Sequence, residues 1–271
     1  MAGHLVRSGL RVGVWSRTPE RTIPMRELGA EVFSSPEGLS KSCDAIVICV
    51  NRTEDVQQVV SDLKRGLAKG SLIVDHSTIA PSAAKDLQAE LEMMGIGFVD
   101  APITGGSMGA QKGQLTIFMG GNEPDCVLAA ELIRPYTKRA ERVGGSGAGQ
   151  MAKMANQIAV AGSLLGLCEC LAFARKAGLD ISQMKEMIGG GAAGSWAFEN
   201  YGPKILASDW SPGFSVKNQR KDFGYCRGAA EDLGASIPGT LLVDSLLKVL
   251  QDKGRGEETT AALFEVLIGE A

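Results

Sequence analysis

The feature that most constrains the fold of this chain is the alternation of short apolar runs with helical patterns along its first half. The apolar runs are RVGVW (11–15), DAIVICV (44–50), SLIVD (71–75), IGFVD (96–100) and LTIFMG (115–120). Segments with apolar residues at i, i+3 and i+4 accompany them, within 19–29, 53–67, 81–95 and 123–137. This alternation predicts buried strands in a doubly wound, mostly parallel sheet that is covered by helices.

The pattern changes after ERVGGSGAG (141–149), because no convincing strand follows that segment. Helical patterns cover 150–178, 181–188, 195–206, 213–233, 237–253 and 257–269. We therefore expect an α/β domain over 1–146 and an all-helical domain over 147–271. The small residues of AVAGSLLG (159–166) would let a neighbouring backbone approach the long helix closely, which favours a homodimer or homotetramer.

Charge and composition exclude several classes of protein. The 28 Lys and Arg residues face 31 Asp and Glu, a net charge of −3, so we expect neither a nucleic-acid partner nor a membrane partner. The longest apolar stretch (158–168) has 11 residues, too few to span a bilayer, and no signal peptide is visible. The six cysteines form no C-x-x-C pair, which predicts free thiols, no metal site and a cytoplasmic location.

Polar residues follow the first predicted strand, where an open α/β sheet binds its ligand. A dinucleotide-binding sheet that prefers NAD has an acid at the end of its second strand, whereas an arginine accommodates the 2′-phosphate of NADP. Here Ser16, Arg17 and Thr18 follow RVGVW, and the acid is missing. These residues favour NADP over NAD, although an ordinary exposed arginine at a helix start would look the same.

Two further strand ends carry candidate residues. HSTIAP follows SLIVD, and from the residues alone Ser77 or Thr78 is expected to cap the next helix. DAPITGGSMGAQKGQLTIFMGG (100–121) contains six glycines directly after an apolar run. The N–H groups of Thr104, Gly105 and Gly106 could hold a carboxylate, or the segment could be a flexible connection.

Lys153 is the candidate general acid and base. It lies in the apolar helix GQMAKMANQIAVAG, one turn from Asn156 and Gln157. Desolvation would lower the pKa of such a lysine toward neutrality, as acid–base catalysis requires. The alternative is a lysine that extends its amine to solvent from the helix end. Neither His4 nor His76 is an obvious acid, and Lys221 reads from its spacing as part of a solvated face.

Taken together, the segments VWSRT, DHSTIAP, DAPITGGSMGAQKGQLTIFMGG, GSGAGQMAKMANQ and RKDF resemble the β-hydroxyacid dehydrogenase family over essentially the whole chain. The resemblance implies an α/β Rossmann-type domain followed by an all-α domain. It also implies roles for matching residues. The catalytic residue would be Lys153, the substrate contacts would be Thr104, Gly105, Gly106, Asn156 and Gln157, and the cofactor contacts would be Ser16, Arg17, Thr18, Val50, Asn51, Thr78 and Lys221.

The chain departs from the family pattern at its start. The family opens with a strand and a G-x-G-x-M-G turn that seats the pyrophosphate, whereas MAGHLVRSG matches the helix after that turn. We therefore expect a Rossmann-type domain without its first strand, with exposed sheet edges and weakened cofactor binding. A second departure is KMANQ, because many members have a second asparagine in place of Gln157.

The resemblance implies an NAD(P)-dependent oxidoreductase that interconverts a small β-hydroxy acid and its semialdehyde. NADP would be the preferred cofactor and NAD the second choice, and the substrate would be a small carboxylate. The competing interpretation is a non-catalytic or inactive dinucleotide-fold protein, which the absent pyrophosphate motif favours and the retained Lys153 opposes. An imine-reducing relative is disfavoured, because such enzymes usually replace that lysine.

Overall fold

The computed structural model describes residues 1–270 and divides the chain into two compact units. The first runs from Met1 to Lys153 and the second begins at Met154. The sequence placed the domain boundary at 146–147, ahead of the long helix α8 (Ala148–Lys176), whereas the structural division falls inside that helix.

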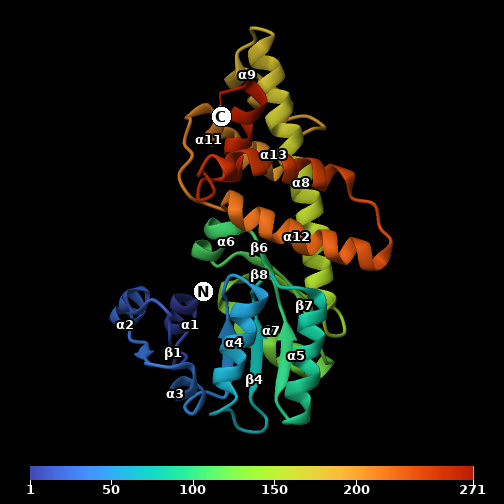
Figure 1. The fold of residues 1–271 in the computed structure, drawn as a ribbon. Coiled ribbons are helices and arrows are strands. Elements are labelled where there is room, and N and C mark those ends of the chain that lie inside the picture. Colours follow the sequence, from blue (N-terminus) through green and yellow to red (C-terminus); the bar gives the residue numbers. More distant parts are fainter. Residues whose placement is uncertain (271) are drawn as a thin grey trace. The chain divides into compact units, whose positions relative to one another are not determined.

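The first unit is built around a mixed six-stranded sheet (Figure 1). Its strands are β3 (Ala45–Ile48), β4 (Leu72–Asp75), β5 (Gly97–Asp100), β6 (Ile103–Thr104), β7 (Leu115–Gly120) and β8 (Thr137–Gly144). The order is β3-β4-β5-β7-β6, and β8 pairs with β7. The pairs β3–β4, β4–β5 and β7–β8 are parallel, whereas β7 runs antiparallel to β5 and β6.

A second, two-stranded parallel sheet holds β1 (Gly13–Val14) and β2 (Glu31–Val32). It lies with short helices in the N-terminal segment, shown in dark blue in Figure 1. These helices are α1 (Ala2–Arg7), η1 (Pro19–Thr22), α2 (Ile23–Glu27) and α3 (Pro36–Ser40). Among the described residues 1–270, β1 pairs only with β2, and β3 pairs only with β4. Each of these two strands therefore keeps one unpaired edge.

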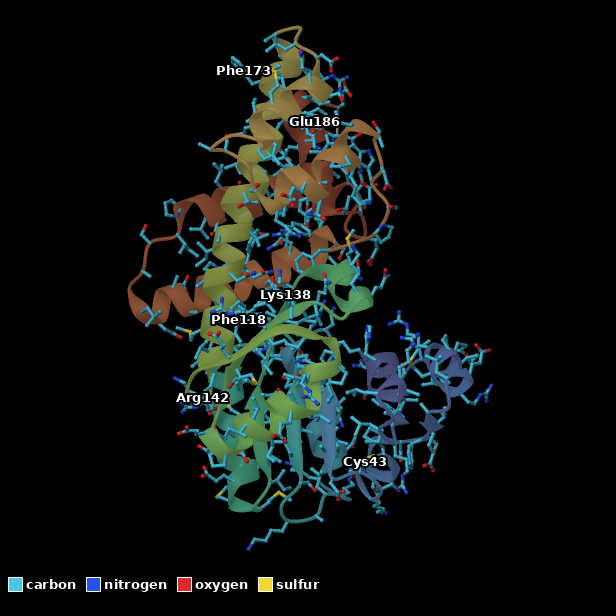
Figure 2. All side chains as sticks on the ribbon, turned by 180° about the vertical axis from the view of Figure 1, so that it is seen from behind. Cys43, Phe118, Lys138, Arg142, Phe173 and Glu186 are labelled. Carbon is cyan, nitrogen blue, oxygen red and sulfur yellow. The ribbon has the colours of Figure 1, made fainter. Side chains whose placement is uncertain are left out.

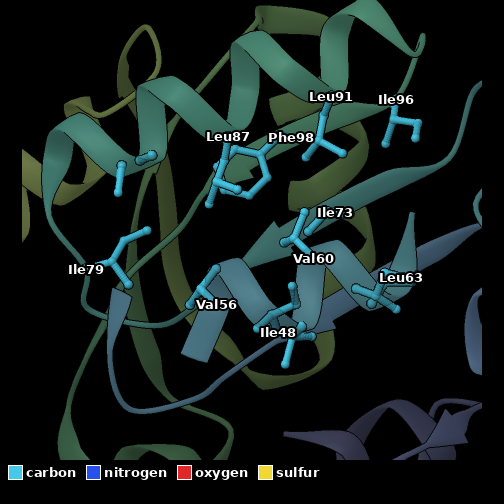
Figure 3. Close-up of a cluster of buried hydrophobic side chains, with 14 of the residues drawn as sticks. Ile48, Val56, Val60, Leu63, Ile73, Ile79, Leu87, Leu91, Ile96 and Phe98 are labelled. Atoms are coloured by element: carbon cyan, nitrogen blue, oxygen red, sulfur yellow. The ribbon is translucent and has the colours of Figure 1, made fainter. Parts of the chain in front are cut away.

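Helices α4 (Thr53–Leu63), α5 (Pro81–Met93) and α7 (Glu123–Ile133) pack on the main sheet. Figure 3 shows one core cluster, in which Val60 of α4 and Leu87 of α5 approach Ile73 and Phe98 of the sheet. Val74 belongs to the cluster on the other face, because successive strand side chains point to opposite faces. Burying each large apolar side chain stabilises the fold by about 1.5–3 kcal/mol.

The glycine-rich segment is more ordered than a flexible connection. Thr104 ends β6, and residues Gly106–Lys112 form helix α6. The backbone φ angles of Gly105, Gly106 and Gly113 are +120°, +64° and +67°, so glycine is needed at both ends of this helix. Neither α6 nor the strands β2, β6 and β8 are predicted from the sequence, because these elements are short or polar.

The second unit contains only helices, apart from an isolated bridge between Ser215 and Thr259, within its described residues 154–270. Besides most of α8, they are α9 (Ile181–Gly189), α10 (Trp196–Asn200), α11 (Gly202–Leu206), α12 (Val216–Leu233), α13 (Pro238–Asp252), η3 (Thr260–Ala262) and α14 (Leu263–Ile268). The predicted helical half is confirmed. Ser195 caps α10 by accepting a hydrogen bond from the N–H of Phe198.

By length and composition alone, α8 is the one helix in residues 1–270 that could cross a membrane. The uninterrupted apolar run in this helix has 11 residues, which alone is too short for a span, whereas the whole helix has 29 residues. The core helix of a globular domain passes the same test. Leu164, Leu167 and Leu171 are buried inside the second unit, so this part of α8 belongs to its core.

Candidate active site

Most of the predicted site residues in the first unit follow the ends of parallel strands. Ser16, Arg17 and Thr18 follow β1, Val50 and Asn51 follow β3, Thr78 follows β4, and Thr104, Gly105 and Gly106 come after β5. Ligands of open α/β sheets bind beyond the carboxyl ends of the strands. The predicted residues of this unit therefore lie where such a sheet binds its ligand.

Arg17 is held at the end of β1 by an ion pair. Its Nη2 atom lies 2.8 Å from Oδ1 of Asp55, and its side chain is 65% exposed. The other oxygen of Asp55 accepts a hydrogen bond from the N–H of Arg52 at the start of α4. Ser16 Oγ accepts one from the N–H of Thr18. The guanidinium is thus anchored beside this loop and remains accessible to an anionic ligand.

The loop that contains Thr78 is not organised by helix capping. The N-cap of α5 is Ala80, with no side-chain capping bond, so the expectation that Ser77 or Thr78 caps this helix is wrong. The hydroxyl of Ser77 accepts a hydrogen bond from the N–H of Val50 instead, at 2.9 Å. The N–H of Ser77 donates to Asp75 Oδ1, also at 2.9 Å. The first bond ties the loop after β4 to the loop after β3, and the second holds Ser77 against the end of β4.

Lys153 is a buried residue of α8 whose amine reaches the start of the glycine-rich segment. The residue is 7% exposed, and its Nζ donates a hydrogen bond to the carbonyl oxygen of Ile103 at 2.8 Å. Ile103 directly precedes Thr104, so the amine lies beside the predicted carboxylate loop. The alternative of a lysine that extends to solvent is wrong, because a buried amine with a fixed carbonyl partner has little contact with water.

Two further buried polar residues connect β5 with the start of α8. Neither was singled out from the sequence. Asp100 ends β5 and Gln150 lies in the first turn of α8, and both are fully buried. Asp100 accepts hydrogen bonds from the N–H groups of Gly147 (2.8 Å) and Gln150 (2.9 Å). Burial raises the pKa of Asp100 to about 7, although these N–H donors favour the charged form. The sequence offered one signal for Gln150: it is a polar residue one turn before Lys153 in an otherwise apolar helix.

The His76 side chain is part of the buried structure of the first unit. Its Nδ1 lies 2.6 Å from the carbonyl oxygen of Ala101 and its Nε2 lies 2.8 Å from the hydroxyl of Tyr136. Burial lowers the pKa of His76 to about 4, so the ring is neutral at physiological pH. A neutral ring with both nitrogens engaged is not a general acid. Lys153 therefore remains the candidate.

The second unit joins its predicted residues in one polar chain. Asn156 Nδ2 donates to Gln157 Oε1 at 2.9 Å, and Gln157 Nε2 donates to Asp222 Oδ2 at 2.7 Å. Lys221 Nζ lies 3.1 Å from the other oxygen of Asp222 and 5.5 Å from the ring centre of Tyr225. The Lys221 side chain is 17% exposed, so its interpretation as part of a solvated face is wrong.

Within residues 1–270, no group of three or more His, Cys, Asp or Glu side chains could hold a metal ion. All six cysteines are free thiols, as the composition predicted. Cys168 is buried and Cys170 is only partly so, on different faces of α8. Burial raises the pKa of the thiols of Cys126 and Cys170, so these side chains stay protonated and have little nucleophilic character.

The chain is similar to known dehydrogenases over its whole length. Residues 1–162 match the NAD-binding domain of 6-phosphogluconate dehydrogenase, and residues 147–267 match the NAD-binding domain of NADP-dependent 3-hydroxyisobutyrate dehydrogenase. A probable 3-hydroxyisobutyrate dehydrogenase-like protein of Arabidopsis thaliana is 37% identical, over 98% of this chain and 81% of that protein. The 2-hydroxy-3-oxopropionate reductase of Escherichia coli is 31% identical, over 98% and 92%.

A solved structure supports the same fold. The 3-hydroxyisobutyrate dehydrogenase of Salmonella typhimurium superposes with a TM-score of 0.91 at 24% identity, covering 98% of this chain and 94% of that one. The two family matches and the relatives above 30% identity cover nearly the whole chain. The chain therefore belongs to the β-hydroxyacid dehydrogenase family of NAD(P)-dependent oxidoreductases.

Proposed function

We propose that this protein interconverts a small β-hydroxy acid and its semialdehyde, with Lys153 as the general acid and base. The substrate would be of the 3-hydroxyisobutyrate, tartronate semialdehyde or glyoxylate and succinic semialdehyde type. The observation that carries this proposal is the buried amine of Lys153, which is bonded to Ile103 beside Thr104. The relatives named 3-hydroxyisobutyrate dehydrogenase and 2-hydroxy-3-oxopropionate reductase support the substrate class.

The substrate carboxylate would bind at the start of the glycine-rich segment. Gly105 and Gly106 adopt positive φ angles, and the N-cap of α6, Gly105, makes no side-chain capping bond. The backbone N–H groups there are therefore available to an anion. The hydroxyl of Thr104 adds a further donor. The family resemblance implies Asn156 and Gln157, which follow Lys153 on α8, as further substrate contacts.

The chemistry divides between the cofactor and the lysine. A bound cofactor would supply the redox chemistry: its reduced nicotinamide would give a hydride to the aldehyde carbon, and its oxidised nicotinamide would take a hydride from the carbinol carbon in the reverse direction. In the reduction, Lys153 would give a proton from Nζ to the carbonyl oxygen as negative charge develops there. In the oxidation, the neutral amine would take the hydroxyl proton. The hydrogen bond to Ile103 O orients the amine for either direction.

The residues at the strand ends fit a nicotinamide dinucleotide with a preference for NADP. Arg17 is exposed and anchored at the end of β1, where an arginine accommodates the 2′-phosphate. Ser16 and Thr18 would add hydroxyl contacts to that phosphate. Val50, Asn51 and Thr78 would contact the remainder of the cofactor, and Lys221 would contribute a positive charge from the second unit.

The test is a screen of small semialdehydes with NADPH and NADH, followed by the Lys153→Ala variant. We expect turnover of at least one carboxylate-bearing semialdehyde with NADPH. Because acid–base catalysis contributes about 100-fold or more, kcat of Lys153→Ala should fall by at least that factor, with NADPH affinity within about threefold. Lys176→Ala, in the exposed last turn of the same helix, is the matched control and should retain wild-type activity.

Two results would contradict the proposal. A Lys153→Ala variant that keeps more than about a tenth of wild-type kcat would exclude the acid–base role. A wild-type chain that binds neither NADPH nor NADH in a fluorescence titration would instead indicate the non-catalytic interpretation.

A further inference from the structure

The side-chain amide of Gln150 binds the backbone on both sides of Thr78. Its Oε1 accepts a hydrogen bond from the N–H of Ile79 at 3.1 Å, and its Nε2 donates to the carbonyl oxygen of Ser77 at 2.8 Å. Gln150 is fully buried, so water does not compete for either bond. We call this arrangement the amide clamp. It fixes the two peptide groups that flank the predicted cofactor contact.

The main chain of Gln150 is fixed at the same time from the other side. Its N–H and that of Gly147 donate to the two carboxylate oxygens of Asp100 at the end of β5. Gly149 allows this close approach, because a Cβ there would lie 2.4 Å from the carbonyl oxygen of Asp100 and 2.6 Å from that of Phe118. The first turn of α8 therefore packs closely against the end of β5.

Lys153 lies three residues after Gln150 on the same helix, and its amine is bonded to Ile103 O. One turn of α8 thus carries both the proposed proton donor and the clamp on the Thr78 loop. The distance between a nicotinamide held at that loop and the amine of Lys153 would depend on this turn. Misplacement by about 1 Å can cost on the order of 100-fold in rate.

We infer that Gln150 is a positioning residue that sets the Thr78 loop relative to Lys153. This inference rests on the proposed function, because it assigns the cofactor to the Thr78 loop. Gln150 acts through its two hydrogen bonds and takes no part in proton or hydride transfer. Its loss would leave the N–H of Ile79 and the carbonyl of Ser77 buried without their partner, and the loop would reorganise to satisfy them.

The test compares Gln150→Leu with Gln219→Leu. Gln219 on α12 is equally buried, and neither atom of its amide has a hydrogen-bond partner in the described residues. We expect Gln150→Leu to raise the amide hydrogen-exchange rate of residues 77–79 and to weaken NADPH binding at least about tenfold, with kcat lowered by a similar factor. KM for the semialdehyde should stay within about threefold. Gln219→Leu should change none of these quantities.

Unchanged exchange at 77–79 in a folded Gln150→Leu variant would overturn the clamp. Faster exchange with NADPH affinity and kcat within about twofold of wild type would overturn the positioning role. Circular dichroism checks the fold, and Gln150→Met replaces Gln150→Leu if the branched side chain is not tolerated. If wild type reduces no semialdehyde, the proposed function fails, whereas the exchange rates and the NADPH affinity still decide the inference.

Discussion

Arg17 is the residue on which cofactor choice depends at the scale of single side chains. Its ion pair with Asp55 is exposed, and such pairs contribute only about 0–1 kcal/mol to stability. The pair therefore serves to orient the guanidinium more than to stabilise the fold. A phosphate could exchange for the carboxylate, because arginine binds both through the same N–H donors.

We expect Arg17→Ala to raise the Kd for NADPH at least about tenfold and the Kd for NADH by less than about threefold. Fluorescence titration with both cofactors measures these constants. Arg139→Ala is the matched control, because Arg139 is equally exposed (68%) and equally paired, with Glu141 on β8. An equal loss of affinity for both cofactors would contradict a role for Arg17 in reading the 2′-phosphate.

The raised pKa of Asp100 makes the stability of the folded protein depend on pH. Its pKa in the folded protein is raised to about 7 by burial, above the ordinary value near 4. The folded state therefore holds a proton that the unfolded state has lost, and the free energy of unfolding decreases as pH rises from about 4 to 7. Between pH 5 and pH 8 this effect is on the order of 2 kcal/mol.

Asp100→Asn removes that proton equilibrium. We expect the stability of wild type relative to Asp100→Asn, measured by urea unfolding, to be lower at pH 8 than at pH 5 by about that amount. The absolute stability of the variant is a separate matter, because asparagine offers one acceptor where the carboxylate offers two. A relative stability that is constant over this range would show that Asp100 does not titrate there.

The sequence could predict single residues where a chemical type and a position coincide. Arg17 follows a strand and Lys153 is a cation in an apolar helix, so both were singled out from the residues alone, whereas Thr78 was expected only to cap a helix and became a cofactor candidate through the family resemblance. Asp100 and Gln150 were missed because their partners are backbone groups of Gly147, Ser77 and Ile79. Backbone partners have no signature in sequence, and they become visible only when the loops and the helix are placed together.

At the scale of elements, the glycine-rich segment is the part of the site that most depends on backbone conformation. Gly106 begins α6 with a φ of +64°, and a Cβ at this position would meet no atom within 4 Å. A substitution there strains the backbone without a steric clash. This property separates the effect of conformation from that of packing.

We expect Gly106→Ala to lose about 1 kcal/mol of stability and to raise KM for the semialdehyde at least about tenfold, because the carboxylate loop must keep its shape. Gly178→Ala is the control, since Gly178 has a φ of +74° with equally open space after α8. It should lose similar stability and keep the wild-type KM. Equal KM values for the two variants would mean that Gly106 does not shape the binding loop.

Elements with strong periodicity were predicted within a few residues, and short or polar ones were not. β7 spans the residues expected from LTIFMG, and α5 begins at the expected Pro81. β8 was missed because TKRAERVG is rich in charged residues and shows no apolar–polar alternation along its largely exposed strand. α6 was missed because two of its seven residues, Gly106 and Gly109, are glycines, which are less favourable than alanine by about 1 kcal/mol each inside a helix.

At the scale of the whole molecule, α8 presents an unusual exposed face in the second unit. Ala155, Ala159, Gly162 and Gly166 are exposed on it, and Phe173 is 75% exposed. Figure 2 shows Phe173 projecting from its helix. Small residues let another backbone approach closely, and the exposed ring of Phe173 adds apolar surface on the same helix. Contact with a membrane or with another subunit would cover these residues. The net charge of −3 argues against attraction to an acidic bilayer, so subunit contact is favoured.

We propose that this face joins copies of the chain into a homodimer or homotetramer. Sedimentation velocity should give a mass that is twofold or fourfold that of the 28.4 kDa chain. Phe173→Glu should shift the population to monomer, because it would bury an unpaired charge in the interface. Met93→Glu, at a residue of α5 that is 85% exposed, is the control and should leave the mass unchanged. A wild-type monomer at all concentrations would contradict the proposal, and equal dissociation of both variants would place the interface elsewhere.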